Sequence, residues 1–163
     1  MKMIPKLSDT QIHEIAEAID TTNDVCYFNA GTGEYVLMND ESLHDNGISW
    51  EVEDGPDANW PAWQKELYND VKADMAKIDS WEEVIRIERP TPDEFFGFME
   101  RFVDEVIPEG NLKDKFWNAL SRSHPFRNFK ALVDDCAYRE AWFNFKEEAL
   151  EEYVRGRLGE EDN

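Results

Sequence analysis

Hydrophobic and polar positions follow two different periods in the N-terminal part of the chain. Between residues 9 and 19, four apolar side chains recur at helical spacing, and a serine and a glutamine placed as a capping box precede them. Residues 25–29 and 34–38 are rich in aromatic and β-branched side chains and are separated by two glycines that can take positive φ. The pattern predicts a helix followed by a β-hairpin.

Three further segments extend this part of the chain. Apolar and polar residues alternate over 48–52, and residues 84–88 form a short β-prone run. Between them, Pro61 opens a helical pattern of about 17 residues, and Trp60 and Trp63 begin its apolar stripe. We expect both tryptophans in the core and one or two strands added to the hairpin.

The C-terminal half shows only the helical period. Helices are predicted over about residues 92–106, 112–120, 125–133 and 138–158. Thr91, Asn111 and Ser123 are the expected N-caps of the first three, and Gly159 is the expected C-cap of the last.

These elements predict an α+β fold in which a small antiparallel sheet, the hairpin plus one or two further strands, packs against five to six helices. The 163 residues fit a single globular domain over residues 1–158, and the 41% of hydrophobic residues argue against disorder. We expect residues 159–163 to form a disordered acidic tail.

The net charge of −20 is unevenly distributed. Residues 1–100 contain 7 Lys and Arg against 23 Asp and Glu, whereas residues 101–158 contain 10 against 11. Such a surface repels phosphate backbones and anionic lipids and attracts cationic proteins. We therefore expect a basic protein partner, no direct nucleic-acid binding and no membrane binding.

The chain has two cysteines, Cys26 and Cys136, without the spacing of a zinc site or a disulfide scaffold. We expect buried thiols in a reducing cytoplasm, and the chain has no apolar run of signal-peptide or membrane-span length. The acidic stretch 39–59 lacks the ligand offsets of a calcium loop and is interpreted as a solvated face. No metal and no cofactor are expected.

The main candidate site is a basic and aromatic cluster in the C-terminal half. Its residues are Arg122, His124, Arg127, Lys130, Arg139 and Trp142. One interpretation is a binding site for an anion or a partner peptide. In the other, Arg127 and Arg139 bond to carboxylates of the acidic N-terminal half and stabilise the fold. Phe126, Phe129 and Trp142 are interpreted as core.

Catalysis is the alternative for the same region. His124 with Asp134 or Asp135 could supply a general base and its orienting carboxylate, and either cysteine a nucleophile. The sequence contains no nucleophile elbow, phosphate loop or HExxH motif. Pairs of Lys130 with Asp134 and of Asp135 with Arg139, each four residues apart, explain the two acids as surface charges.

Several segments resemble a bacterial family known as uncharacterised protein family 0158. They are residues 85–90 (IRIERP), 98–103 (FMERFV), 125–130 (PFRNFK) and 142–145 (WFNF), together with the hairpin at 32–34. The likeness extends from about residue 12 to residue 158. The resemblance implies a bacterial α+β domain and implies no activity.

We therefore expect a non-catalytic interaction or regulatory protein of the cytoplasm whose acidic surface binds a basic protein. The alternative is a small enzyme or an anion-binding protein with a site around His124, Arg127 and Asp134.

Overall fold

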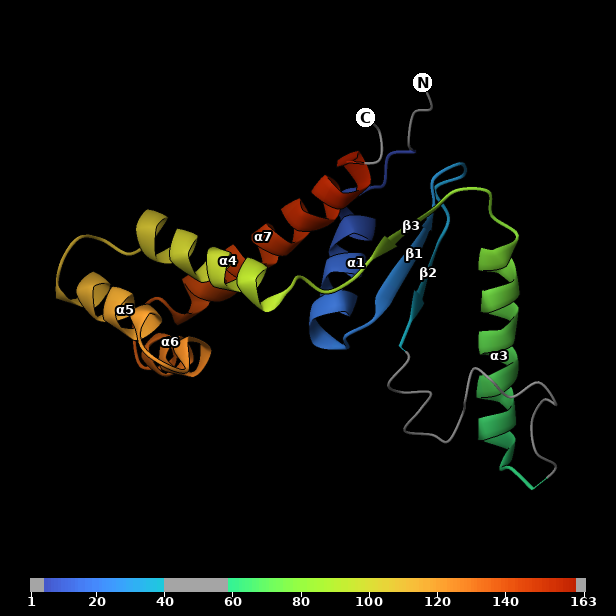
Figure 1. Cartoon of the computed structure of the whole chain (residues 1–163), viewed down its shortest axis with the longest axis horizontal. Helices are drawn as coiled ribbons and strands as arrows, with labels where there is room; N and C mark the ends of the chain where they lie inside the picture. The colour runs from blue at the N-terminus through green and yellow to red at the C-terminus, as the bar shows by residue number, and fades with distance from the viewer. Residues whose placement is uncertain (1–4, 40–58, 161–163) are drawn as a thin grey trace. The chain divides into compact units, whose positions relative to one another are not determined.

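The computed structural model describes residues 5–39 and 59–160, which contain six helices and three strands (Figure 1). The predicted α+β fold is confirmed. The chain divides into two compact units, an N-terminal unit of Met1–Arg89 with Val154–Asn163 and a helical unit of Pro90–Tyr153. The expected single domain over residues 1–158 stays a prediction.

The N-terminal unit is built on a three-stranded antiparallel sheet. Its elements are α1 (Asp9–Thr21), β1 (Val25–Asn29), β2 (Tyr35–Met38), α3 (Ala62–Asp79) and β3 (Val84–Ile87). The strand order is β2-β1-β3, and Cys26 in the central strand pairs with Leu37 on one side and Ile87 on the other. The β-prone run at 84–88 is therefore confirmed as a strand, whereas the predicted strand at 48–52 lies outside the described residues.

Local sequence signals set the start of α1 and its attachment to the sheet. The backbone N–H of Gln11 donates to Ser8 Oγ at 3.2 Å, and the Ser8 N–H donates to Gln11 Oε1 at 2.9 Å, which completes the predicted capping box. Tyr35 in β2 donates its hydroxyl proton to Glu14 Oε1 in α1 at 3.1 Å. Helix α1 thus packs against the hairpin, and Ile15 of the helix and Phe28 of β1 are fully buried.

One of the two tryptophans at the start of α3 differs from expectation. Trp60 is half-buried and its ring meets Tyr68 at 5.8 Å, but Trp63 is 54% exposed, so its predicted place in the core was wrong. The apolar spacing defines a helix face without showing how much of it a neighbour covers, and on α3 the covered part centres on Tyr68. An ion pair of Lys77 with Glu34 joins the C-terminal end of α3 to the hairpin.

The helical unit packs its helices around one aromatic core. The helices are α4 (Pro92–Glu105), α5 (Asn111–Ser121), α6 (Pro125–Asp134) and α7 (Arg139–Glu160), whose last turns belong to the N-terminal unit. Phe102 is fully buried, and its ring centroid lies 6.2 Å from that of Phe129, 5.2 Å from that of Trp142 and 5.5 Å from that of Phe145. None of the described helices has the length and apolar character needed to cross a membrane.

The helix ends of this unit agree only in part with the expected caps. Thr91 caps α4 with a complete capping box. The N-cap of α5 is Gly110 at φ 148° rather than Asn111, and that of α6 is His124 at φ 59° rather than Ser123. Both helices begin after a residue with positive φ, so backbone geometry rather than a side-chain oxygen sets their start. Gly159 lies inside α7 and does not end it.

Candidate functional site

The structure places the six predicted site residues at three different points of the helical unit. Arg122 is the C-cap residue of α5, and His124 is the N-cap residue of α6. Arg127 and Lys130 are exposed on α6. Arg139 begins α7, where Trp142 is half-buried one turn later.

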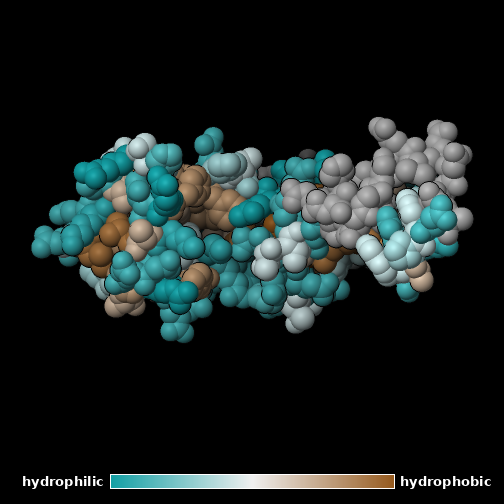
Figure 2. Space-filling model, turned by 90° about the horizontal axis from the view of Figure 1, so that it is seen from below, coloured by the Kyte–Doolittle hydropathy of each residue, from teal (hydrophilic) through white to brown (hydrophobic). Residues whose placement is uncertain are grey.

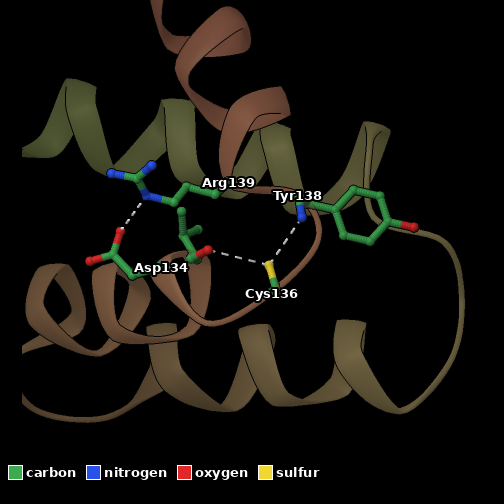
Figure 3. Close-up of polar contacts among 5 residues, drawn as sticks. Asp134, Cys136, Tyr138 and Arg139 are labelled. Atoms are coloured by element: carbon green, nitrogen blue, oxygen red, sulfur yellow. Dashed lines mark hydrogen bonds and ion pairs between the residues drawn. The ribbon is translucent and has the colours of Figure 1, made fainter.

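Arg139 is held by its own neighbours at the junction of α6 and α7 (Figure 3). Its Nε lies 3.3 Å from Asp134 Oδ1, and its guanidinium lies 4.9 Å from the centroid of the Phe143 ring. The described partner of Arg139 is therefore in α6, and the interpretation that Arg139 bonds to the acidic N-terminal half stays a prediction. The pairing with Asp135 was wrong, because the α6–α7 turn brings Asp134 to the guanidinium instead.

Cys136 fixes the same turn. Its thiol donates to the Val133 carbonyl oxygen at 3.5 Å, and its sulfur accepts from the Tyr138 N–H at 3.4 Å (Figure 3). Burial raises the pKa of the other thiol, Cys26 in β1, to about 12. Cys26 is therefore a neutral thiol at neutral pH, without the lowered pKa of an activated nucleophile.

The aromatic members of the cluster divide between core and surface. Phe129 is buried, and the Trp142 ring packs against it in a T-shaped arrangement with the ring centroids 4.8 Å apart. Both residues therefore belong to the core, as expected. Phe126 is 43% exposed and contacts Phe96 at 6.4 Å, so its predicted core position was wrong. It lies in the first turn of α6, beyond the part of that helix buried around Phe129 and Val133.

Arg127 makes no ion pair or side-chain hydrogen bond among residues 5–39 and 59–160. The same holds in these ranges for Arg122 and Lys130, so the expected pair of Lys130 with Asp134 is not formed. The predicted link from Arg127 to the N-terminal half is thus not found in the described part of the chain. Binding of an anion or a peptide by these cations stays a prediction.

A different site lies on α4. An open groove of about 530 Å³ runs along this helix and is bordered by one residue of α5. It is lined by Glu94, Gly97, Phe98, Glu100, Arg101, Asp104 and Trp117. Figure 2 shows that the surface of the α4–α6 region carries hydrophobic patches between hydrophilic residues. The groove combines both kinds of surface, because aromatic rings and carboxylates border the same space.

The charges of the groove are unbalanced. Arg101 lies 3.8 Å from Glu105 and 3.8 Å from Glu152, and its guanidinium lies over the ring of Phe145 at 5.5 Å. Its charge is therefore already offset outside the groove. Within the described residues, the carboxylates of Glu100 and Asp104 have no hydrogen bond or ion pair. They are four residues apart on one helix, where like charges destabilise it by about 0.2–0.5 kcal/mol.

The aromatic side of the groove is also exposed. Trp117 is 37% exposed and has no ring contact with another described residue. Gly97 lies on the groove side of α4, and a Cβ added there would meet nothing within 4 Å. An exposed indole beside two unpaired carboxylates can bind a cationic side chain through both its charge and its apolar part.

Comparison with known proteins identifies the family. The model of uncharacterised protein family UPF0158 matches residues 63–162. The chain belongs to this family. The match includes all of α4 and α5, and hence the groove of this UPF0158 member, but begins after the hairpin, whose likeness at residues 32–34 stays a prediction. No curated protein and no solved structure matches the chain.

The groove of this UPF0158 protein could not be read from the apolar spacing of α4. That spacing places Phe98 on the same helix face as Phe102, although Phe98 borders the groove. A signal was present in α5, where Trp117 directly follows Phe116 and so falls off the apolar stripe of the helix. A tryptophan outside the stripe indicates a surface aromatic residue.

Proposed function

We propose that the protein is a non-catalytic interaction or regulatory protein that binds a basic segment of a partner protein, and that the α4–α5 groove is its binding surface. The observation that carries the proposal concerns Glu100 and Asp104, whose carboxylates have no ion pair or hydrogen bond within residues 5–39 and 59–160 and line the same groove as the exposed Trp117. A partner that brings cations to this groove relieves the repulsion between the two acids.

The charge of the whole chain supports the same partner. A net charge of −20 accelerates association with a cationic protein and opposes binding to nucleic acids and anionic membranes. The free cysteines Cys26 and Cys136 support a location in the reducing cytoplasm of a bacterium. The groove is favoured over the region of His124, Arg127 and Asp134 because the Asp134 carboxylate is already bound by Arg139.

The proposal is tested with a fluorescein-labelled peptide of alternating arginine and glycine residues, titrated with the full chain at about 150 mM salt, where long-range attraction is screened beyond about 8 Å. Glu100→Gln with Asp104→Asn should weaken binding by about fivefold to thirtyfold, as expected for the loss of two charge contacts. Fluorescence anisotropy measures the affinity.

The matched control is Glu66→Gln with Asp70→Asn. These acids are also exposed and four residues apart, but they lie on α3. Both double variants change the net charge equally, so they differ only in the position of the lost charges. Because the α3 acids lie outside the groove lining, the control should bind the peptide as the wild type does. Equal affinities for the two double variants would show that only the total charge matters and would overturn the proposal.

A further inference from the structure

We infer that the groove selects arginine in its partner, by stacking one guanidinium on Trp117 while the alkyl part of that side chain lies over Gly97. This inference rests on the proposed function, because it names the side chain that enters the same groove. It makes Trp117 and Gly97 the residues that determine specificity, whereas Glu100 and Asp104 supply attraction to any cation.

Trp117 is suited to this role because its ring is available. The residue before it, Phe116, is fully buried, so α5 is anchored while the indole at the next position stays 37% exposed. Guanidinium groups already stack on rings in this unit, Arg139 over Phe143 at 4.9 Å and Arg101 over Phe145 at 5.5 Å. Trp117 has no such cation among the described residues.

Arg101, the cation in the groove lining, is not free to stack on the Trp117 ring. Arg101 is engaged by the Phe145 ring and by Glu152, both on α7. The carboxylates of Glu100 and Asp104 are then available to the ligand. A planar guanidinium presents five N–H donors, so it can stack on an indole and still donate to more than one carboxylate. A lysine ammonium is a compact and strongly hydrated charge that stacks less well.

Gly97 supplies the space over which the side chain lies. Glycine is the least favourable residue inside a helix apart from proline, and alanine is the most favourable. The fold does not require glycine here, since an added Cβ would meet nothing within 4 Å. Its position in the groove wall instead matches a surface kept free for close approach of a ligand.

Two variants test the inference, with the arginine–glycine peptide and its lysine–glycine counterpart as probes. The wild type should prefer the arginine peptide by about threefold or more. Trp117→Leu should weaken arginine binding by about threefold to thirtyfold and bring the arginine-to-lysine affinity ratio close to one. A purely structural role of Trp117 would leave this ratio unchanged, so an unchanged ratio overturns the inference.

Gly97→Ala gives an independent readout. The added methyl group should raise the melting temperature, because it favours the helix, and should weaken arginine binding by about fivefold or more, because it occupies the groove. Unchanged arginine affinity in this variant contradicts the assigned position of the side chain.

The two proposals fail in different ways. If Glu100→Gln with Asp104→Asn weakens binding while Trp117→Leu and Gly97→Ala bind as the wild type does, the proposed function stands and the arginine inference is overturned. If the double acid variant binds as the α3 control does, the proposed function and the inference are both overturned.

Discussion

Replacing Phe102 by alanine should destabilise the helical unit more than any surface change in it. Phe102 has no solvent exposure and meets three aromatic rings, those of Phe129, Trp142 and Phe145, at centroid distances of 5.2–6.2 Å. Truncating a buried phenylalanine costs about 3–5 kcal/mol, because transfer free energy is lost and a cavity remains. We expect about 4 kcal/mol, or a melting temperature lower by roughly 8–16 °C.

Phe126→Ala is the matched control in the same unit. Phe126 is 43% exposed, and its ring contacts that of Phe96 at the surface, so its removal should cost under about 1.5 kcal/mol. Urea unfolding followed by far-UV circular dichroism gives both free energies of unfolding. Equal costs for the two variants, or a cost for Phe102→Ala below about 1.5 kcal/mol, would refute the assignment of Phe102 to the core centre.

Three other predictions concern groups with unusual surroundings. Lys113 is buried and donates to the Asp104 carbonyl oxygen and to the Glu109 carboxylate, each at 3.1 Å. Lys113→Met should therefore lower the free energy of urea unfolding by about 1–3 kcal/mol. Glu109→Gln should lower it by under about 1 kcal/mol, because the Glu109 side chain is 91% exposed. Under native conditions a maleimide reagent should label the half-buried Cys136 and spare Cys26, and equal labelling would contradict the burial of Cys26. Burial raises the Cys26 pKa from 9.0 to about 12, so the folded state keeps a proton that the unfolded state releases, and the free energy of unfolding should fall between pH 9 and 12. Cys26→Ala should show a shallower fall, and an unchanged slope would contradict the shift.

The elements of the fold were predictable where their signals are local in sequence. The capping boxes of α1 and α4 each join residues three positions apart, so Ser8 and Thr91 mark the helix starts correctly. The starts of α5 and α6 were misplaced because they depend on positive φ at Gly110 and His124. The neighbouring Asn111 and Ser123 were predicted as N-caps from their side chains, but neither is the N-cap residue in the structure.

The candidate site was less predictable, because it depends on which helix faces meet. Apolar spacing assigned Trp63 and Phe126 to the core, but both are about half exposed, so the described elements leave those two helix turns partly uncovered. Glu100 and Trp117 lie on two helices whose relative register follows from core packing. Sequence periodicity describes each helix alone, so it could not bring these two side chains to one groove.

The location of the binding surface is tested most directly by an NMR titration of the 15N-labelled chain with the arginine–glycine peptide. The amide signal of Gly97 and the indole N–H signal of Trp117 should shift first and saturate together. Shifts confined to α3 around Glu66 and Asp70, with the signals of Gly97 and Trp117 unmoved, would contradict this location.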